Sequence, residues 1–135
     1  MKKITAVIVD DERLARVNLK KLLESYEAID IVGEADSCAS AVSVILKFRP
    51  RLIFLDIQLI GESGFDLLEQ LDSDIHVIFV TAFDQYAIRA FEVNAIDYIL
   101  KPVNPERLKK AVDRLTDTQV RQIPGSKFNY DDLIF

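Results

Sequence analysis

Residues 51–56 form a short apolar run that ends in a carboxylate, Asp56. The four residues before Asp56 show no polar alternation, which predicts a strand buried on both faces of a sheet. A carboxylate at the last position of such a strand leaves the core at the carboxyl edge, where open α/β folds bind ligands. This run therefore predicts a parallel α/β sheet with Asp56 at its functional edge.

The rest of the chain repeats the same strand-then-helix pattern. Apolar, β-branched runs predict strands over residues 4–9, 29–33, 51–56, 76–81 and 95–100. Helical spacing predicts helices over residues 14–23, 38–48, 65–71, 86–91 and 105–115, with Ser37 as a cap and Pro105 at a first helical position. Five alternations predict a doubly wound, five-stranded parallel sheet with helices on both faces.

The predicted helices have expected apolar faces. In the first helix we expect the face to be formed by Leu14, Val17, Leu22 and Leu23. In the second we expect it to be formed by Ala41, Val42, Ile45, Leu46 and Phe48.

Length and charge limit the classes of function. The 135 residues suit one domain, and a net charge of −5 argues against this chain binding nucleic acid by itself. The single cysteine, Cys38, allows no internal disulfide and suits a reducing cytoplasm. No apolar stretch approaches the roughly 20 residues of a membrane helix, and no signal-like segment follows Met1.

Complementary side chains follow four of the predicted strands: Asp10 and Asp11, Asp56, Thr81, and Lys101. Three neighbouring carboxylates repel one another, and a hard cation such as Mg²⁺ removes that conflict. Lys101 and Thr81 suit the oxygens of a phosphoryl group, and a carboxylate such as Asp56 can act as its nucleophile. Taken singly, Asp11 could be a helix cap, Thr81 a strand residue and Lys101 a surface charge, but together they favour a phosphoryl site.

Four motifs carry a family resemblance: Val9-Asp10-Asp11-Glu12, Leu55-Asp56-Ile57-Gln58, Val80-Thr81-Ala82 and Leu100-Lys101-Pro102. With them, residues 4–115 resemble the receiver domain of bacterial two-component response regulators. Residues 81–87, 90–92 and 97–98 resemble the receivers attached to LytTR-type DNA-binding domains. The resemblance implies a flavodoxin-like fold with strand order 2-1-3-4-5.

The resemblance also implies the roles of the acidic residues. Asp56 accepts a phosphoryl group from a sensor histidine kinase or from a small donor such as acetyl phosphate. Mg²⁺ is bound by Asp11, Asp56 and the backbone carbonyl of Gln58, while Asp10 acts through a water.

Further roles follow for the later strands. Thr81 and Lys101 hold the phosphoryl oxygens, and Tyr98 turns inward when Thr81 moves. The Lys101–Pro102 bond is expected to be cis. A face made by the fourth helix, fifth strand and fifth helix, containing Tyr86, Ile88, Arg89 and residues near Val112, is expected to form a homodimer.

We predict a receiver domain over residues 1–121. Because the periodic pattern is lost and residues 122–126 contain proline and glycine, we predict a linker or tail over residues 122–135. The apolar end at residues 133–135 suggests a cut inside a longer protein. DNA would be bound only through a domain absent from this chain, and we expect no membrane contact and a cytoplasmic location.

One position departs from the family pattern. Receivers usually carry proline four residues after the acceptor, where this chain has Ile60. The pitch of that loop is therefore left open. Gln58 and Phe83 stand two residues beyond Asp56 and Thr81, where Phe83 is expected to slow hydrolysis of the phosphoryl group.

Three other functions stay open from the residues. A phosphohydrolase with an aspartate nucleophile would need a second aspartate where Gln58 stands. A flavin or nucleotide binder would need a Gly/Ser/Thr-rich loop where Asp10, Asp11 and Glu12 stand. A receiver-like module that takes no phosphate is the third. We assign no role in the chemistry to His76, at the start of its strand, or to Cys38.

Overall fold

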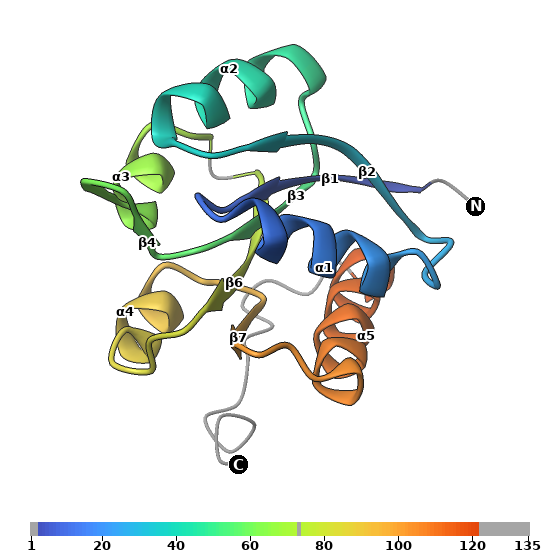
Figure 1. Ribbon diagram of the computed structural model, residues 1–135. Helices are drawn as coiled ribbons and strands as arrows, with labels where there is room; N and C mark the ends of the chain where they lie inside the picture. Colours follow the sequence, from blue (N-terminus) through green and yellow to red (C-terminus); the bar gives the residue numbers. More distant parts are fainter. Residues whose placement is uncertain (1–2, 73, 122–135) are drawn as a thin grey trace. The chain divides into compact units, whose positions relative to one another are not determined.

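A computed structural model describes residues 3–72 and 74–121 (Figure 1). Its parallel sheet has the strand order β2-β1-β3-β6-β7, which confirms the predicted doubly wound α/β class. The described residues form two compact units, with the division after His76. The predicted tail at residues 122–135 lies outside the described residues, so the predicted domain division stays a prediction.

In the first unit, the described residues form three of the long strands, three helices and a short hairpin. These elements are β1 (Ile4–Val9), α1 (Arg13–Leu23), β2 (Ile29–Ala35), α2 (Cys38–Phe48), β3 (Leu52–Leu55), β4 (Gln58–Leu59), β5 (Glu62–Ser63) and α3 (Gly64–Glu69). Strand β1 pairs in parallel with β2 on one side and with β3 on the other. Figure 1 shows α1 and α2 on opposite sides of β1 and β2. The four residues of β3 are all buried, as its apolar run predicts.

The buried faces of two helices differ from those predicted. In α1 the prediction was wrong for Leu14 and Val17, which are 75% and 36% exposed, whereas Leu23 is buried as predicted, together with Leu19. Leu19 and Leu23 are four residues apart and share a helix face, whereas Leu14 stands one position away from that stripe. In α2 the buried stripe is Cys38, Ala41 and Ile45, so the prediction was also wrong for Leu46 and Phe48, which are exposed.

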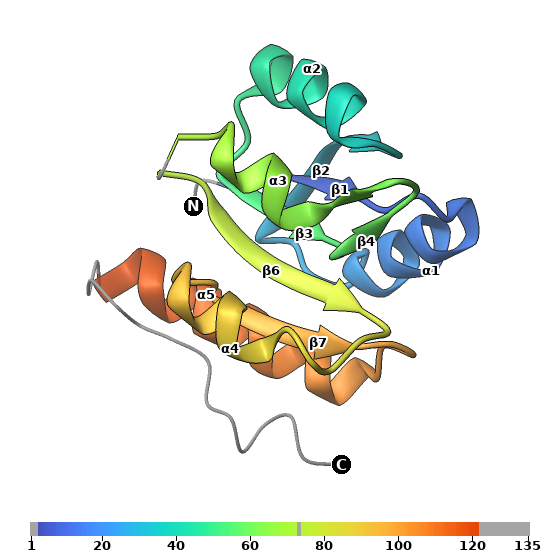
Figure 2. The same ribbon diagram turned by 90° about the vertical axis from the view of Figure 1, so that its left-hand side faces the viewer.

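The described part of the second unit, which ends at residue 121, contains two strands and two helices. Strand β6 (His76–Thr81) leads into it, followed by α4 (Ala87–Glu92), β7 (Asp97–Leu100) and α5 (Pro105–Arg121). Strands β6 and β7 are parallel and lie side by side, as Figure 2 shows. Among the described residues, none of the helices has the length and apolar character needed to cross a bilayer.

Helix α5 begins as predicted and is fixed to β7 by buried charge. Asn104 caps it, because its side-chain oxygen accepts hydrogen bonds from the N–H groups of Glu106 and Arg107 at 2.8 and 3.3 Å. Asp97 is fully buried, and its carboxylate pairs with Arg107 at 2.6 Å and Arg114 at 3.0 Å. These ion pairs hold α5 against β7.

Candidate functional site

The backbone of the sheet positions two of the predicted acidic residues. The N–H of Asp10 donates to the carbonyl of Ala35 at 3.0 Å, and the N–H of Asp56 donates to the carbonyl of Val9 at 3.0 Å. Asp10 and Asp56 are thus the first residues beyond β1 and β3, and the neighbouring strand still holds each of them. This is why two positions 46 residues apart arrive at one edge.

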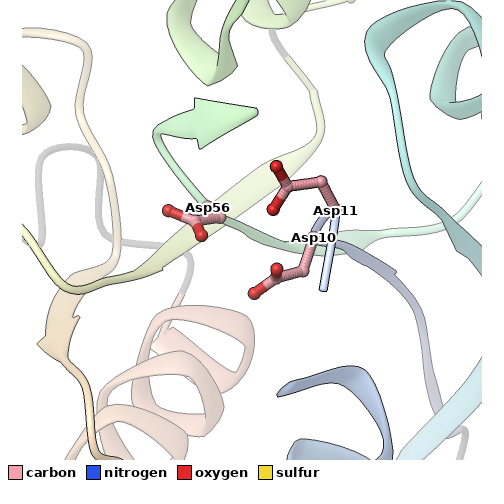
Figure 3. Close-up of side chains that lie close together, drawn as sticks. All are labelled: Asp10, Asp11 and Asp56. Atoms are coloured by element: carbon pink, nitrogen blue, oxygen red, sulfur yellow. The ribbon is translucent and has the colours of Figure 1, made fainter. Parts of the chain in front are cut away.

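Asp10, Asp11 and Asp56 form an acidic cluster (Figure 3). One carboxylate oxygen from each lies within 4.8 Å of the others, and Asp10 and Asp56 are only 5% and 6% exposed. Water screens such charges poorly, so their repulsion favours a bound cation. Asp11, unlike the other two, is only half-buried, so a cation can reach the cluster from solvent. Three carboxylates fit a hard cation that takes oxygen ligands.

Local hydrogen bonds orient two of these carboxylates. The Asp10 carboxylate accepts from the N–H of Glu12 at 2.9 Å, and the Asp56 carboxylate accepts from the N–H of Gln58 at 3.3 Å. The alternative role of Asp11 as a helix cap is wrong, because Glu12 occupies the N-cap position of α1. Asp11 is therefore available to the cluster.

The loop after Asp56 contains a hairpin that the sequence pattern did not predict. Strands β4 and β5 pair across a two-residue turn in which Gly61 has a φ of +72° and Ile60 is 84% exposed. The Glu62 carboxylate at the far side of the turn accepts the N–H of Cys38, at the start of α2, at 2.6 Å. The loop that lacks proline is thus fixed by a hairpin anchored to a helix. Its signal in the sequence is a glycine in a two-residue turn.

Gly64 closes this loop against the acidic cluster. Its N–H donates to the carbonyl of Ile57 at 2.6 Å. A Cβ at this position would lie 2.4 Å from the carbonyl oxygen of Asp56, which is shorter than any ordinary contact. Only glycine therefore allows α3 to begin this close to the predicted acceptor.

Thr81, Lys101 and Tyr98 come together within the second unit. The N–H of Lys101 donates to the carbonyl of Thr81 at 2.8 Å, and the Lys101–Pro102 bond is cis, as the resemblance implied. The Thr81 hydroxyl oxygen accepts from the N–H of Phe83 at 3.5 Å, and the hydroxyl of the buried Tyr98 donates to the carbonyl of Phe83. Phe83 therefore links the side chains of Thr81 and Tyr98. The prediction that these residues and the acidic cluster serve one phosphoryl group stays a prediction.

Two ionisable residues without an assigned role lie elsewhere. Cys38 is buried, and burial, reinforced by the nearby Glu62 carboxylate, raises the pKa of its thiol to about 11. His76 begins β6, at the opposite end of that strand from Thr81. Burial, followed by the charge of Arg51, lowers the pKa of His76.

Comparisons with known proteins agree with these observations. Residues 6–113 match the family model of the response regulator receiver domain. The chain is 45% identical over 121 residues to the transcriptional regulatory protein BtsR of Salmonella typhi, covering 88% of this chain and 51% of that protein. It is 42% identical over 123 residues to the sensory transduction protein LytT of Bacillus cereus, covering 89% of this chain and 50% of that protein. This chain thus spans about half the length of the curated relatives it matches.

A solved structure supports the same assignment. The response regulatory domain of protein mrkE from Klebsiella pneumoniae superposes with a TM-score of 0.79 at 31% identity, covering 88% of this chain and 100% of that one. The relatives include LytT, which agrees with the predicted likeness to LytTR-type receivers. The chain belongs to the response regulator receiver domain family.

Proposed function

We propose that this chain is a phosphorylation-activated switch in which Asp56 accepts a phosphoryl group from a sensor histidine kinase. The observation that carries the proposal is the acidic cluster, in which Asp56 is nearly buried at the end of β3 with Asp10 and Asp11 beside it. The chain then acts as a signalling domain and not as a dedicated enzyme.

The transfer itself needs little from the protein beyond placement and charge. The P–N bond of the donor phosphohistidine breaks as a P–O bond forms to a carboxylate oxygen of Asp56. The imidazole nitrogen keeps the electron pair of the broken bond and takes up a proton. We propose that Lys101 and the hydroxyl of Thr81 hold the oxygens of the transferred group.

Asp10, Asp11, Asp56 and the backbone carbonyl of Gln58 would hold Mg²⁺. The oxygen donors of the cluster fit this ion, and the repulsion among three carboxylates gives the site a reason to bind it. When bound, Mg²⁺ neutralises charge on the carboxylates and on the incoming phosphoryl group.

The contacts around Phe83 support a route from phosphorylation to the surface. When Thr81 turns toward the phosphoryl group, its long hydrogen bond with the N–H of Phe83 is lost. The carbonyl of Phe83 is the partner of the Tyr98 hydroxyl, so a shift of Phe83 changes where Tyr98 is held. A bias of a few kcal/mol between two arrangements is enough for such a switch.

We propose that the output is a homodimer through the face formed by α4, β7 and α5. Ile88 of α4 and Val93, which caps the end of that helix, are 64% and 44% exposed, and the exposed Arg89 adds charge beside them. In the full-length protein, a LytTR-type DNA-binding domain outside this chain would control transcription in the cytoplasm. Light scattering with beryllofluoride in place of the phosphoryl group tests the dimer, and a monomer at high concentration contradicts it.

Intact-mass analysis after treatment with acetyl phosphate and Mg²⁺ tests the phosphoryl transfer. Wild type should gain one phosphoryl group and Asp56→Asn should gain none. A wild-type chain that gains no mass would favour a receiver-like module that takes no phosphate. Rapid, continued turnover of phosphoryl donors would instead favour a phosphohydrolase.

A further inference from the structure

Arg16 of α1 contacts the acidic cluster through the backbone of Asp10 and not through a carboxylate of the cluster. Its guanidinium Nη1 donates to the backbone carbonyl of Asp10 at 2.7 Å, and its Nε donates to the carboxylate of Glu34 on β2 at 3.1 Å. The Arg16 side chain is only 16% exposed, so both bonds are partly shielded from water. The Arg16 guanidinium therefore connects α1 to Asp10, at the end of β1, and to Glu34 in β2.

Glu34 is itself held in place. Its second carboxylate oxygen accepts from the Nζ of Lys20 at 2.7 Å, and it pairs in the sheet with Ile8, two residues before Asp10. The hydrogen bond from Lys20, followed by the one from Arg16, lowers the pKa of Glu34 despite an opposing effect of burial. Glu34 is thus a fixed anion to which the planar fork of Arg16 can bind in one orientation.

We infer that Arg16, oriented by Glu34, is a positioning residue that fixes the Asp10–Asp11 turn for binding of a divalent cation. The N–H of Asp10 is already bonded to the carbonyl of Ala35, and its carboxylate to the N–H of Glu12. Arg16 fixes the remaining polar group of Asp10, its backbone carbonyl. With the backbone of Asp10 fixed, the carboxylates of Asp10 and Asp11 need less ordering when the cation arrives. This inference rests on the proposed Mg²⁺ site.

Positioning and simple electrostatics predict opposite results for loss of Arg16. A positive charge near three carboxylates competes with a cation, so electrostatics alone predicts that Mg²⁺ binds more tightly without Arg16. If Arg16 acts by positioning, Mg²⁺ binds more weakly without it. Outer-shell partners of metal ligands typically contribute 10–100-fold in affinity. We expect about 10-fold for Arg16, because it holds backbone and not a ligand atom.

The test is a titration of the 135-residue chain with Mg²⁺, followed by the amide signals of residues 10–12 in ¹H–¹⁵N NMR spectra. Arg16→Met should raise the dissociation constant about 10-fold. Lys20→Met is the matched control, because it removes the same charge from the same helix and the other partner of Glu34 without touching Asp10. It should leave Mg²⁺ affinity unchanged or slightly higher.

The inference would be overturned if Arg16→Met bound Mg²⁺ as tightly as wild type or more tightly. It would also be overturned if Arg16→Met and Lys20→Met lost the same amount of affinity. If Arg16→Met does not fold, Arg16→Lys decides. It keeps the charge but cannot bond Glu34 and Asp10 in the same geometry, so positioning predicts weaker binding and charge alone predicts no change. If Asp11→Asn bound Mg²⁺ with wild-type affinity, the proposed metal site would be overturned as well. Binding that is lost in Asp11→Asn but kept in Arg16→Met would overturn only the role of Arg16.

Discussion

Replacing Gly64 by alanine should disturb the predicted acceptor more than any comparable change in its loop. The added methyl group would lie 2.4 Å from the carbonyl oxygen of Asp56 and 3.1 and 3.2 Å from two side-chain carbons of Leu55. Ordinary contacts begin at 3.4 Å, so the two backbone segments must separate by about 1 Å. The 2.6 Å hydrogen bond from Gly64 to Ile57 resists that separation.

Overpacking of this kind costs about 1–3 kcal/mol, and we place Gly64→Ala near about 2 kcal/mol because its closest contact is with backbone. With a typical urea dependence, that loss lowers the unfolding midpoint by about 1 M. Acetyl phosphate should also modify Asp56 about 10–100-fold more slowly, since a shift of about 1 Å at a reacting group has effects of that size. Urea unfolding and the time course of intact mass measure the two effects.

Gly61→Asn is the matched control within the same loop. A Cβ added at Gly61 would meet no atom within 4 Å, and the φ of +72° is one that asparagine tolerates better than other side chains. Gly61→Asn should therefore cost less stability than Gly64→Ala and leave the rate of phosphorylation unchanged. If Gly64→Ala behaved like Gly61→Asn in both assays, the proposed close approach between α3 and the acceptor would be refuted.

Three further predictions concern residues away from the acidic cluster. Arg107→Met should lower the free energy of unfolding, measured in urea, by about 3 kcal/mol, because it removes a partner from the fully buried Asp97. Loss of the exposed, ion-paired Lys109 should cost less than about 0.5 kcal/mol, and equal effects of the two changes would contradict this reasoning. Burial raises the pKa of the Cys38 thiol to about 11 from an ordinary 9.0. At pH 8 the thiol should therefore react with a thiol reagent at least about 100-fold more slowly in the folded chain than in urea. Equal rates would show that the thiol is not buried. His76 has a folded pKa below its ordinary 6.5, so its contribution to stability is complete above that pH and is lost as the pH falls through the folded pKa. Thermal unfolding from pH 7.5 to 5.5 should show this loss in wild type and less of it in His76→Gln, and two identical profiles would exclude His76 as the cause.

The strands and the acidic residues were predictable because one local property determines both. An unbroken apolar run predicts a buried strand, and the first charged residue after it must lie at the sheet edge. The rule predicts the positions of Asp10 and Asp56 without knowledge of any tertiary contact. The Ser37 cap of α2 and the start of α5 at Pro105 were predictable from equally local signals.

The missed features depend on distance in the chain or on very short elements. Strands β4 and β5 have two residues each, too few for a periodic pattern to appear. The contact between Arg16 and Glu34 joins residues 18 apart, and only the packing of α1 beside β2 brings them together. Leu14 was assigned to the wrong face because apolar spacing alone does not show which stripe of a short helix packs on the sheet.

The most direct test of the proposed function locates the phosphoryl group. The chain is treated with acetyl phosphate, with Mg²⁺ or with a chelator, and the modified peptide is identified by tandem mass spectrometry. Our proposal predicts one phosphoryl group, on Asp56, that is absent from the chelated sample and from Asp56→Asn. A phosphoryl group on another residue, or none on wild type in the presence of Mg²⁺, would contradict it.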